Sequence, residues 1–183
     1  MENKKIHVVT HSSRFHADDV CAVATLMLLY GEENMQLTRT RDISIIEAAD
    51  IVLDVGGVFD PEAKRFDHHQ ESFDEKRENG IPYASFGLVW HEYGEQLCSS
   101  EDIAKYIDAS LVQSIDAGDN GVETYTTLFE EVSPFTIASM VSMYIPSWKE
   151  SDAITDDMFI EITKVINNLL QRIYTKTELF NEA

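Results

Sequence analysis

The feature that most constrains the fold is the run Ile51-Val52-Leu53-Asp54-Val55, which is apolar except for one aspartate and is followed by Gly56-Gly57. A strand with one face in water alternates apolar and polar residues, whereas a continuous apolar strand is typical of a sheet covered on both faces. The two glycines allow a tight departure from the strand. The run therefore predicts a strand of a mostly parallel sheet between layers of helices.

The rest of the chain alternates strand and helix patterns. Further strands are expected at residues 6–10, 36–40 and 64–67. Helices are expected from a cap at Asp18 or Asp19 to Gly31, and then over residues 42–49, 84–97, 99–117, 134–144 and 155–180. This alternation predicts an α/β fold of three layers, α/β/α, with a mostly parallel sheet.

The last helix carries an apolar stripe at helical spacing, which indicates packing against the core or against a neighbouring chain. The stripe consists of Phe159, Ile162, Ile166, Leu169, Leu170 and Ile173. We expect a metal-binding catalytic domain over residues 1–122 and a helical extension or connector packed on it over residues 123–183.

Charge and composition exclude several classes of partner. The chain of 183 residues has 33 acidic and 14 basic residues, for a formal net charge of −19. Proteins that bind long duplex nucleic acid use a face rich in lysine and arginine, so that partner is not expected. No stretch approaches the roughly 18 apolar residues of a membrane span, and the first residues lack signal-peptide character. We expect a cytoplasmic protein with no membrane partner, in which Cys21 and Cys98 are small apolar residues.

Imidazole and carboxylate side chains gather where strands and helices are expected to end. The carboxyl ends of parallel strands meet at one edge of a sheet, where the binding site of such folds lies, so we expect these side chains to lie close together. They are His11, His16 and Asp18 on one loop, Asp54 in the apolar strand, the triplet Asp67-His68-His69, and Asp116 with Asp119 and Asn120.

This combination of side chains indicates a centre of two metal ions. An ionised carboxylate in an apolar strand, such as Asp54, costs several kcal/mol unless it is paired or binds metal. Asp116 is expected to end a helix, where a carboxylate opposes the helix dipole and favours a nearby cation. Mixed ligands of this kind suit Mn²⁺, Fe²⁺, Co²⁺ or Zn²⁺, and a bridging aspartate holds two ions about 3.5–4 Å apart. With Asp18, Asp54 and Asp116 as ligands, two divalent ions leave a net positive site, which suits a phosphate substrate.

Six segments together carry a resemblance to a known family, and they extend over most of the chain. They are Thr10-His11 with Phe15-His16-Ala17-Asp18, Arg39-Thr40-Arg41-Asp42, Asp54-Val55-Gly56-Gly57-Val58-Phe59-Asp60-Pro61, Arg65-Phe66-Asp67-His68-His69-Gln70-Glu71-Ser72-Phe73, Ser85-Phe86-Gly87-Leu88-Val89-Trp90 and Asp116-Ala117-Gly118-Asp119-Asn120-Gly121. This pattern resembles the melanocyte-proliferating-gene-one family of metal-dependent hydrolases, which is similar to the wider DHH phosphoesterase superfamily. The resemblance implies a DHH-like fold and two divalent metal ions, with Mn²⁺ first and Mg²⁺, Co²⁺, Fe²⁺ or Zn²⁺ as alternatives.

The resemblance also implies a role for each residue. One ion would be held by His11, His16 and Asp54, and the other by Asp18, Asp54, His68 and Asp116, so that Asp54 bridges them. His16 stands where the wider superfamily has an aspartate, which is expected to shift the metal preference. The candidate catalytic residues are Asp54, Asp67, which would orient a histidine, and His69, which would lie near the scissile phosphate. Arg39, Arg41 and His69 are candidates for substrate binding, with a structural role as the alternative for the arginines, and Asp19, Asp67, Asp119 and Asn120 are candidates to support the ligands.

Members of this family usually continue into a second domain that closes over the site, and this chain is expected to lack it. We therefore expect a binuclear metal-dependent phosphohydrolase, of phosphodiesterase or nuclease type, whose activity is low or limited to small substrates because catalysis also needs positioning. The expected partners are a small phosphorylated substrate or a short oligonucleotide, and a homodimer is possible. The alternatives are a pyrophosphatase-like hydrolase and a non-catalytic metal-binding regulatory domain.

Overall fold

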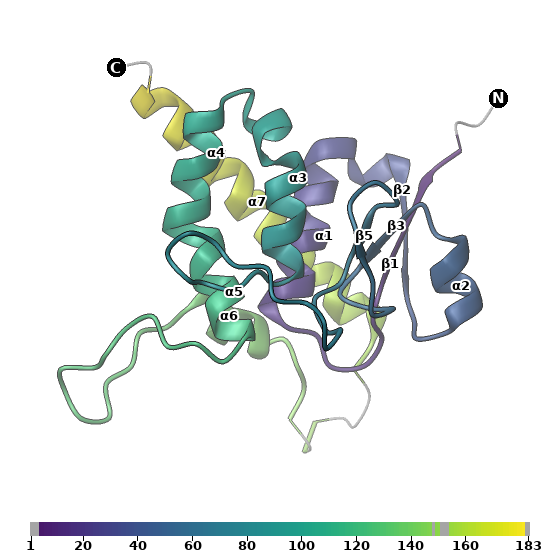
Figure 1. Cartoon of the computed structure of the whole chain (residues 1–183). Coiled ribbons are helices and arrows are strands. Elements are labelled where there is room, and N and C mark those ends of the chain that lie inside the picture. Colours follow the sequence, from purple (N-terminus) through teal and green to yellow (C-terminus); the bar gives the residue numbers. More distant parts are fainter. Residues whose placement is uncertain (1–3, 148, 151–153, 182–183) are drawn as a thin grey trace.

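The computed structural model describes residues 4–147, 149–150 and 154–181, and it contains a five-stranded sheet flanked by helices (Figure 1). The strand order is β2-β1-β3-β5-β4, and all neighbouring strands are parallel except β4 and β5. The strands are β1 (Ile6–Thr10), β2 (Met35–Arg39), β3 (Ile51–Leu53), β4 (Phe59–Asp60) and β5 (Arg65–Phe66). The apolar run of the sequence thus forms a strand of this sheet, as expected, although the strand ends at Leu53 rather than at Val55.

Helices follow most of the strands and dominate the second half of the chain. The α-helices are α1 (Ala17–Tyr30), α2 (Ile43–Ala48), α3 (Ser85–Cys98), α4 (Glu101–Ile107), α5 (Gln113–Asp119), α6 (Ile137–Ser142) and α7 (Asp156–Asn181). A 3₁₀ turn covers Glu32–Asn34, and a π-helical segment, Asp108–Val112, joins α4 to α5.

The two faces of the sheet are covered unequally. The short helix α2 covers one face, where Ile46 and Ala49 pack against Val9, Val52 and Val55. The other face carries α1 and α3, with α4 and α7 farther from the sheet (Figure 1). The α/β class, the mostly parallel sheet and the helical C-terminal part expected from the sequence are therefore confirmed.

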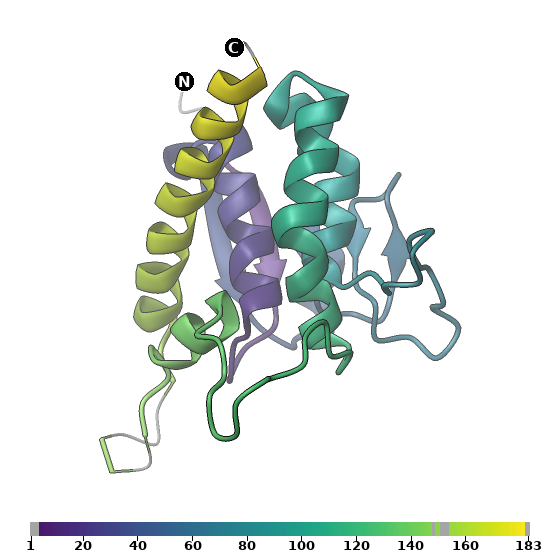
Figure 2. The same ribbon diagram turned by 90° about the vertical axis from the view of Figure 1, so that its left-hand side faces the viewer.

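The long C-terminal helix α7 is part of the main core. It runs beside α1 (Figure 2), and the Asn167 side-chain amide donates to the Ala24 carbonyl at 3.0 Å. The apolar stripe predicted for this helix is buried at Phe159, Ile162, Ile166 and Leu170, and half-buried at Leu169 and Ile173. The stripe therefore packs against the core of its own chain.

Two expected helices differ from the structure in ways that affect the site. The first helix begins at Ala17, so its capping residue is His16 rather than Asp18 or Asp19. The helix expected over residues 99–117 contains the π-helical segment Asp108–Val112 and continues to Asp119. The wider π turn rotates the residues that follow it around the helix axis. Asp116 consequently lies within the last helical turns, and Asp119 occupies the helix end.

Smaller differences lie outside the site. The strand β4 was not expected, because a two-residue strand gives no periodicity to detect. The helix α6 begins at Ile137 rather than at Pro134, because Thr136 caps it through the Ser139 backbone N–H. Cys21 and Cys98 are buried and free, as expected. Among the described residues, no helix has both the length and the apolar character needed to cross a membrane.

Candidate metal centre

Asp54 lies at the centre of the site, in the turn directly after β3. Its backbone φ of 54° is in the left-handed region, and Gly56 and Gly57 follow with φ of 97° and 67°. The residue is 4% exposed, so a charged group is held away from water. Its carboxylate faces three imidazoles: Oδ2 is 3.4 Å from His11 Nε2, and Oδ1 is 3.5 Å from His68 Nε2 and 3.3 Å from His69 Nδ1. The sequence predicted this aspartate within the strand, and the structure places it one residue beyond the strand end.

The first group of possible ligands contains His11, His16 and Asp54, whose ligand atoms lie within 4.8 Å of one another. His11 follows β1, and its Nδ1 lies 3.0 Å from the Ser12 carbonyl oxygen, which leaves Nε2 facing Asp54. The His16 backbone N–H donates to Asp19 Oδ1 at 2.8 Å, and Asp19 Oδ2 lies 3.1 Å from His11 Nε2. Asp19 thus contacts both histidines of the group.

The second group contains Asp18, His68 and Asp119, again with ligand atoms within 4.8 Å. His68 Nε2 lies 3.2 Å from Asp119 Oδ2. Asp18 is fully buried, and its two oxygens accept the backbone N–H groups of Ser85 and Phe86 at 3.1 and 2.7 Å. His11 and His16 therefore fall in one group with Asp54, whereas Asp18 falls in another with His68 and Asp119, although all three come from one short stretch of the chain.

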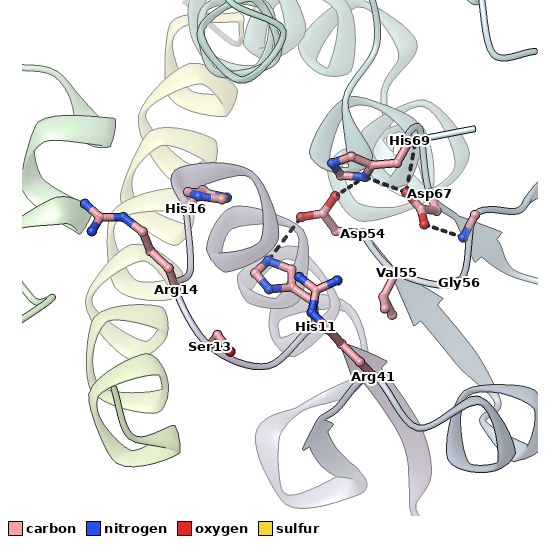
Figure 3. A pocket seen from close by; sticks show the side chains of 11 residues that line it. His11, Ser13, Arg14, His16, Arg41, Asp54, Val55, Gly56, Asp67 and His69 are labelled. Atoms are coloured by element: carbon pink, nitrogen blue, oxygen red, sulfur yellow. Dashed lines mark hydrogen bonds and ion pairs between the residues drawn. The ribbon is translucent and has the colours of Figure 1, made fainter. Parts of the chain in front are cut away.

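His69 is held by Asp67 at the edge of the site. Asp67 Oδ1 lies 2.8 Å from His69 Nδ1, and Asp67 Oδ2 accepts the Gly57 N–H at 2.6 Å (Figure 3). The side chain of His69 is 60% exposed, whereas that of His68 is 7% exposed. Neighbouring histidines thus have different environments, and the ring of His69 faces the open side.

Asp116 is the predicted ligand that the structure places outside both groups. Its Oδ1 accepts the Gly87 N–H at 3.0 Å, and its Oδ2 accepts from Arg77 Nη1 at 2.8 Å. The cation that a carboxylate in this helix was expected to attract is therefore the guanidinium of Arg77. Asn120 donates to the Asp116 carbonyl at 2.9 Å and so supports the helix end. Sequence reasoning missed Arg77, because one arginine in a polar loop carries no signal of its own.

The two arginines predicted near substrate have different surroundings. Arg39 is 8% exposed and donates to the Ser13 carbonyl at 2.6 Å and to Asp156 at 3.1 Å, so it ties the histidine loop to α7. Arg41 lines a cavity of about 510 Å³ that opens beside Asp54 (Figure 3). The lining residues are His11, Ser13, Arg14, His16, Arg41, Asp54, Val55, Gly56, Gly57, Asp67 and His69.

The carboxylates and imidazoles strongly shift one another's proton affinity. Burial disfavours the charged form of each group, but Asp19 and Asp54 raise the pKa of His11 to about 10, and Asp119 and Asp54 raise the pKa of His68 to about 10. In return the two imidazoles hold the pKa of Asp54 well below its usual range, against the effect of burial. Burial and the nearby Asp54, Asp119 and Asp116 raise the pKa of Asp18. The centre thus holds buried carboxylates whose charged forms are stabilised only where a cation lies beside them.

The unsatisfied atoms of the centre fit metal ions. Asp54 Oδ1, His68 Nε2 and Asp19 Oδ2 are buried and have no hydrogen-bond partner among the described residues, although such atoms are nearly always satisfied. Ligand atoms that share an ion at about 2.1 Å lie about 3.0–3.4 Å from one another. The separations of 3.4 Å between His11 Nε2 and Asp54 Oδ2 and of 3.2 Å between His68 Nε2 and Asp119 Oδ2 are close to that spacing. The donor set of imidazoles and carboxylates suits a first-row transition metal.

Comparison with known proteins gives one family. A family model named for the MYG1 exonuclease, and described as an uncharacterised protein family (UPF0160), matches residues 7–181. The chain is 32% identical over 188 residues to the human MYG1 exonuclease, covering 90% of this chain and 49% of that protein. It is 33% identical over 186 residues to a MYG1 protein of Saccharomyces cerevisiae, covering 88% of this chain and 54% of that protein.

A MYG1 protein of Dictyostelium discoideum is 33% identical over 169 residues, covering 83% of this chain and 51% of that protein. The chain spans about half the length of these curated relatives. No solved structure matches it.

Proposed function

The chain belongs to the MYG1 family, and we propose that it is a binuclear metal-dependent phosphohydrolase that cleaves phosphodiester bonds in short oligonucleotides or nucleotides. The observation that carries this proposal is the placement of Asp54. A buried carboxylate has one oxygen toward His11 and the other toward His68 and His69, with Oδ1 free of hydrogen bonds among the described residues. That is the arrangement expected of a ligand shared by two ions.

In this proposal His11, His16 and Asp54 hold one ion, and Asp54, Asp18 and His68 hold the other. The carboxylate that completes the second set is Asp119 rather than Asp116, since Asp119 is beside His68 while Asp116 forms an ion pair with Arg77. Two divalent ions, for which the family resemblance suggests Mn²⁺ first, would supply hydroxide at neutral pH and neutralise phosphoryl oxygens. The triplet Asp67-His68-His69 supports a place for the family within the DHH phosphoesterase superfamily.

The residues around the ions would bind and orient the substrate. His69, oriented by Asp67 through the 2.8 Å contact at Nδ1, presents its other ring nitrogen to the cavity and can donate a proton to a phosphate or leaving-group oxygen. Arg41 lines the same cavity and can pair with a phosphate. Arg39 is better assigned to holding the histidine loop, because its guanidinium contacts Ser13 and Asp156.

The substrate class is supported by two observations. Mammalian relatives of this chain are named exonucleases, which favours a nucleotide substrate over pyrophosphate. The net charge of −19 disfavours a long duplex, because a polyanion is repelled beyond the short range over which the ions act. A short single-stranded oligonucleotide satisfies both conditions.

A cytoplasmic location stays a prediction.

The test is hydrolysis of short RNA and DNA oligonucleotides and of pyrophosphate by the protein loaded with Mn²⁺. We expect cleavage of the oligonucleotides, and we expect Asp54→Asn to lower Mn²⁺ affinity and the rate by at least about 100-fold, because the shared ligand loses its charge. Asp60→Asn is the matched control, since Asp60 is exposed and its carboxylate accepts the Ala63 N–H. Turnover of pyrophosphate alone would favour the pyrophosphatase alternative. A metal-loaded protein that cleaves no phosphate ester would refute the proposal.

A further inference from the structure

Arg77 connects two acidic residues from separate helical segments. Its side chain is 6% exposed, and Nε and Nη2 bind the two oxygens of Asp108 at 3.0 and 2.7 Å, while Nη1 binds Asp116 Oδ2 at 2.8 Å. The guanidinium also lies over the ring of Tyr83, 4.1 Å from its centroid. A planar fork with partners on two sides has a fixed orientation that a lysine cannot reproduce.

The local backbone is adapted to this ion pair. A Cβ atom at position 87 would lie 1.8 Å from Asp116 Oδ2 and 2.8 Å from Arg77 Nη2. A glycine is therefore required where α3 begins, since any side chain there would displace the carboxylate. The Gly87 N–H donates to Asp116 Oδ1 at 3.0 Å, so Asp116 is held from two directions.

The position of Asp116 determines that of Asp119. The two residues are three apart in α5, and residues at this spacing lie on the same face of a helix. Fixing Asp116 against Arg77 sets the rotation of α5, and this rotation brings Asp119 Oδ2 to 3.2 Å from His68 Nε2. Arg77 and His68 belong to the same segment between β5 and α3, so Arg77 joins two of the three chain segments that supply the second ligand group.

Arg77 also neutralises one of the carboxylates beside the ligand groups. Asp18, Asp54 and Asp119 face the ligand groups, and Asp116 lies beside them, so each additional negative charge raises the cost of ionising the others. With Asp116 paired to Arg77, the charge of Asp116 no longer adds to that of Asp18, Asp54 and Asp119.

We propose that Arg77 is a positioning residue for the second metal ion, which it serves by fixing Asp116 and thereby the rotation of α5 that brings Asp119 to His68. This inference rests on the proposed function, because it assumes the two-ion centre. It adds a residue that contacts neither the proposed ions nor the substrate cavity, and it gives Asp116 an indirect role.

The experiment is a calorimetric titration of the full chain with Mn²⁺, together with electron paramagnetic resonance to distinguish a coupled pair of ions from a single ion. For the wild type we expect two ions and a coupled signal. For Arg77→Met, which keeps a similar length but removes the charge and the fork, we expect affinity for the second ion to fall about 10–100-fold, as is typical when the support of a ligand is lost. The first ion should bind unchanged, and the coupled signal should be replaced by that of a single ion. Arg77→Lys should give an intermediate affinity for the second ion.

The matched control is Arg65→Met, since Arg65 is half-buried and donates to the Ala49 carbonyl at 2.9 Å, on the far side of the sheet from Arg77. It should bind both ions as the wild type does, and an equal loss in this variant would overturn the inference by showing general destabilisation. Circular dichroism checks that each variant folds, and if Arg77→Met does not, the Arg77→Lys variant decides. Wild-type affinity for the second ion in the folded Arg77 variants would overturn this inference alone. A wild-type protein that binds no ion would overturn the two-ion centre and the inference with it.

Discussion

At the scale of single residues, Asp54 combines two costs at one position. A non-glycine residue in the left-handed region costs on the order of 1–3 kcal/mol, although aspartate is among the residues that tolerate it best. A buried carboxylate costs more unless cations surround it. This turn places the two carboxylate oxygens beside different histidines, and a turn with a relaxed backbone would not hold them there.

The pKa values at this scale predict how metal binding depends on pH. The pKa values of His11 and His68 are about 10 in the metal-free protein, despite burial, because Asp19, Asp54 and Asp119 favour their protonated forms. Below that pH each imidazole holds a proton that an ion must displace. Mn²⁺ affinity should therefore rise from pH 6 to pH 8, by up to about tenfold per pH unit for each proton released.

The measurement is a Mn²⁺ titration in buffers of different ionisation enthalpy, which gives the number of protons released. Affinity that does not change between pH 6 and pH 8 would show that these imidazoles are not ligands.

At the scale of elements, the start of α3 organises the carboxylates. The first backbone N–H groups of a helix have no partner within the helix and carry partial positive charge. Here Ser85 and Phe86 donate to Asp18, and Gly87 donates to Asp116. One helix end thus holds an aspartate from α1 and another from α5, which explains why two elements far apart in the chain meet at the site.

Substitution of Gly87 tests this arrangement. Gly87→Ala places a Cβ within 1.8 Å of Asp116 Oδ2, so we expect the free energy of unfolding to fall by about 1–3 kcal/mol, as is usual for overpacking. Gly118→Ala is the matched control, because no atom of the described residues outside its own stretch of α5 lies within 4 Å of its Cβ position. It should be neutral or stabilising by up to about 1 kcal/mol. Urea denaturation in the presence of a chelator measures both variants without a contribution from metal. Equal stability of the two alanine variants would contradict the role given to Gly87.

At the scale of the whole molecule, α7 and the first half of the chain share one core. Phe159, Ile162 and Ile166 are fully buried in the same cluster as residues of α1. The Asp156 carboxylate at the start of α7 binds Arg39 at 3.1 Å, and Arg39 in turn holds the loop that carries His16. The C-terminal helix is therefore a support of the first ligand group as well as a part of the core.

Truncation of the stripe should destabilise the molecule as a whole. Ile166→Ala removes a fully buried side chain between α7 and the core, and we expect a loss of about 2–5 kcal/mol in the free energy of unfolding. Val165→Ala, one residue away and 38% exposed, should change it by less than about 0.5 kcal/mol. Chemical denaturation followed by fluorescence and by circular dichroism compares the two. A small effect of Ile166→Ala would mean that α7 is not part of the cooperative core.

Much of the fold follows from local pattern. The apolar run before Gly56-Gly57 and the stripe of α7 are repeats of side-chain type, and burial of such repeats depends little on the rest of the chain. Strand and helix positions were therefore predictable to within a few residues. The π-helical segment and the strand β4 were not, because neither has a periodicity of its own.

The order of residues was enough to predict which side chains could form the centre, since imidazoles and carboxylates follow the expected strands. How these side chains divide into groups depends on the folded chain. Asp18 lies in a group with His68 and Asp119 rather than with His11 and His16, and Asp116 lies against Arg77. The physical reason is that these choices depend on the rotation of α5 and on the N–H groups at the start of α3. Both are set by packing between segments far apart in the chain, which no local pattern records.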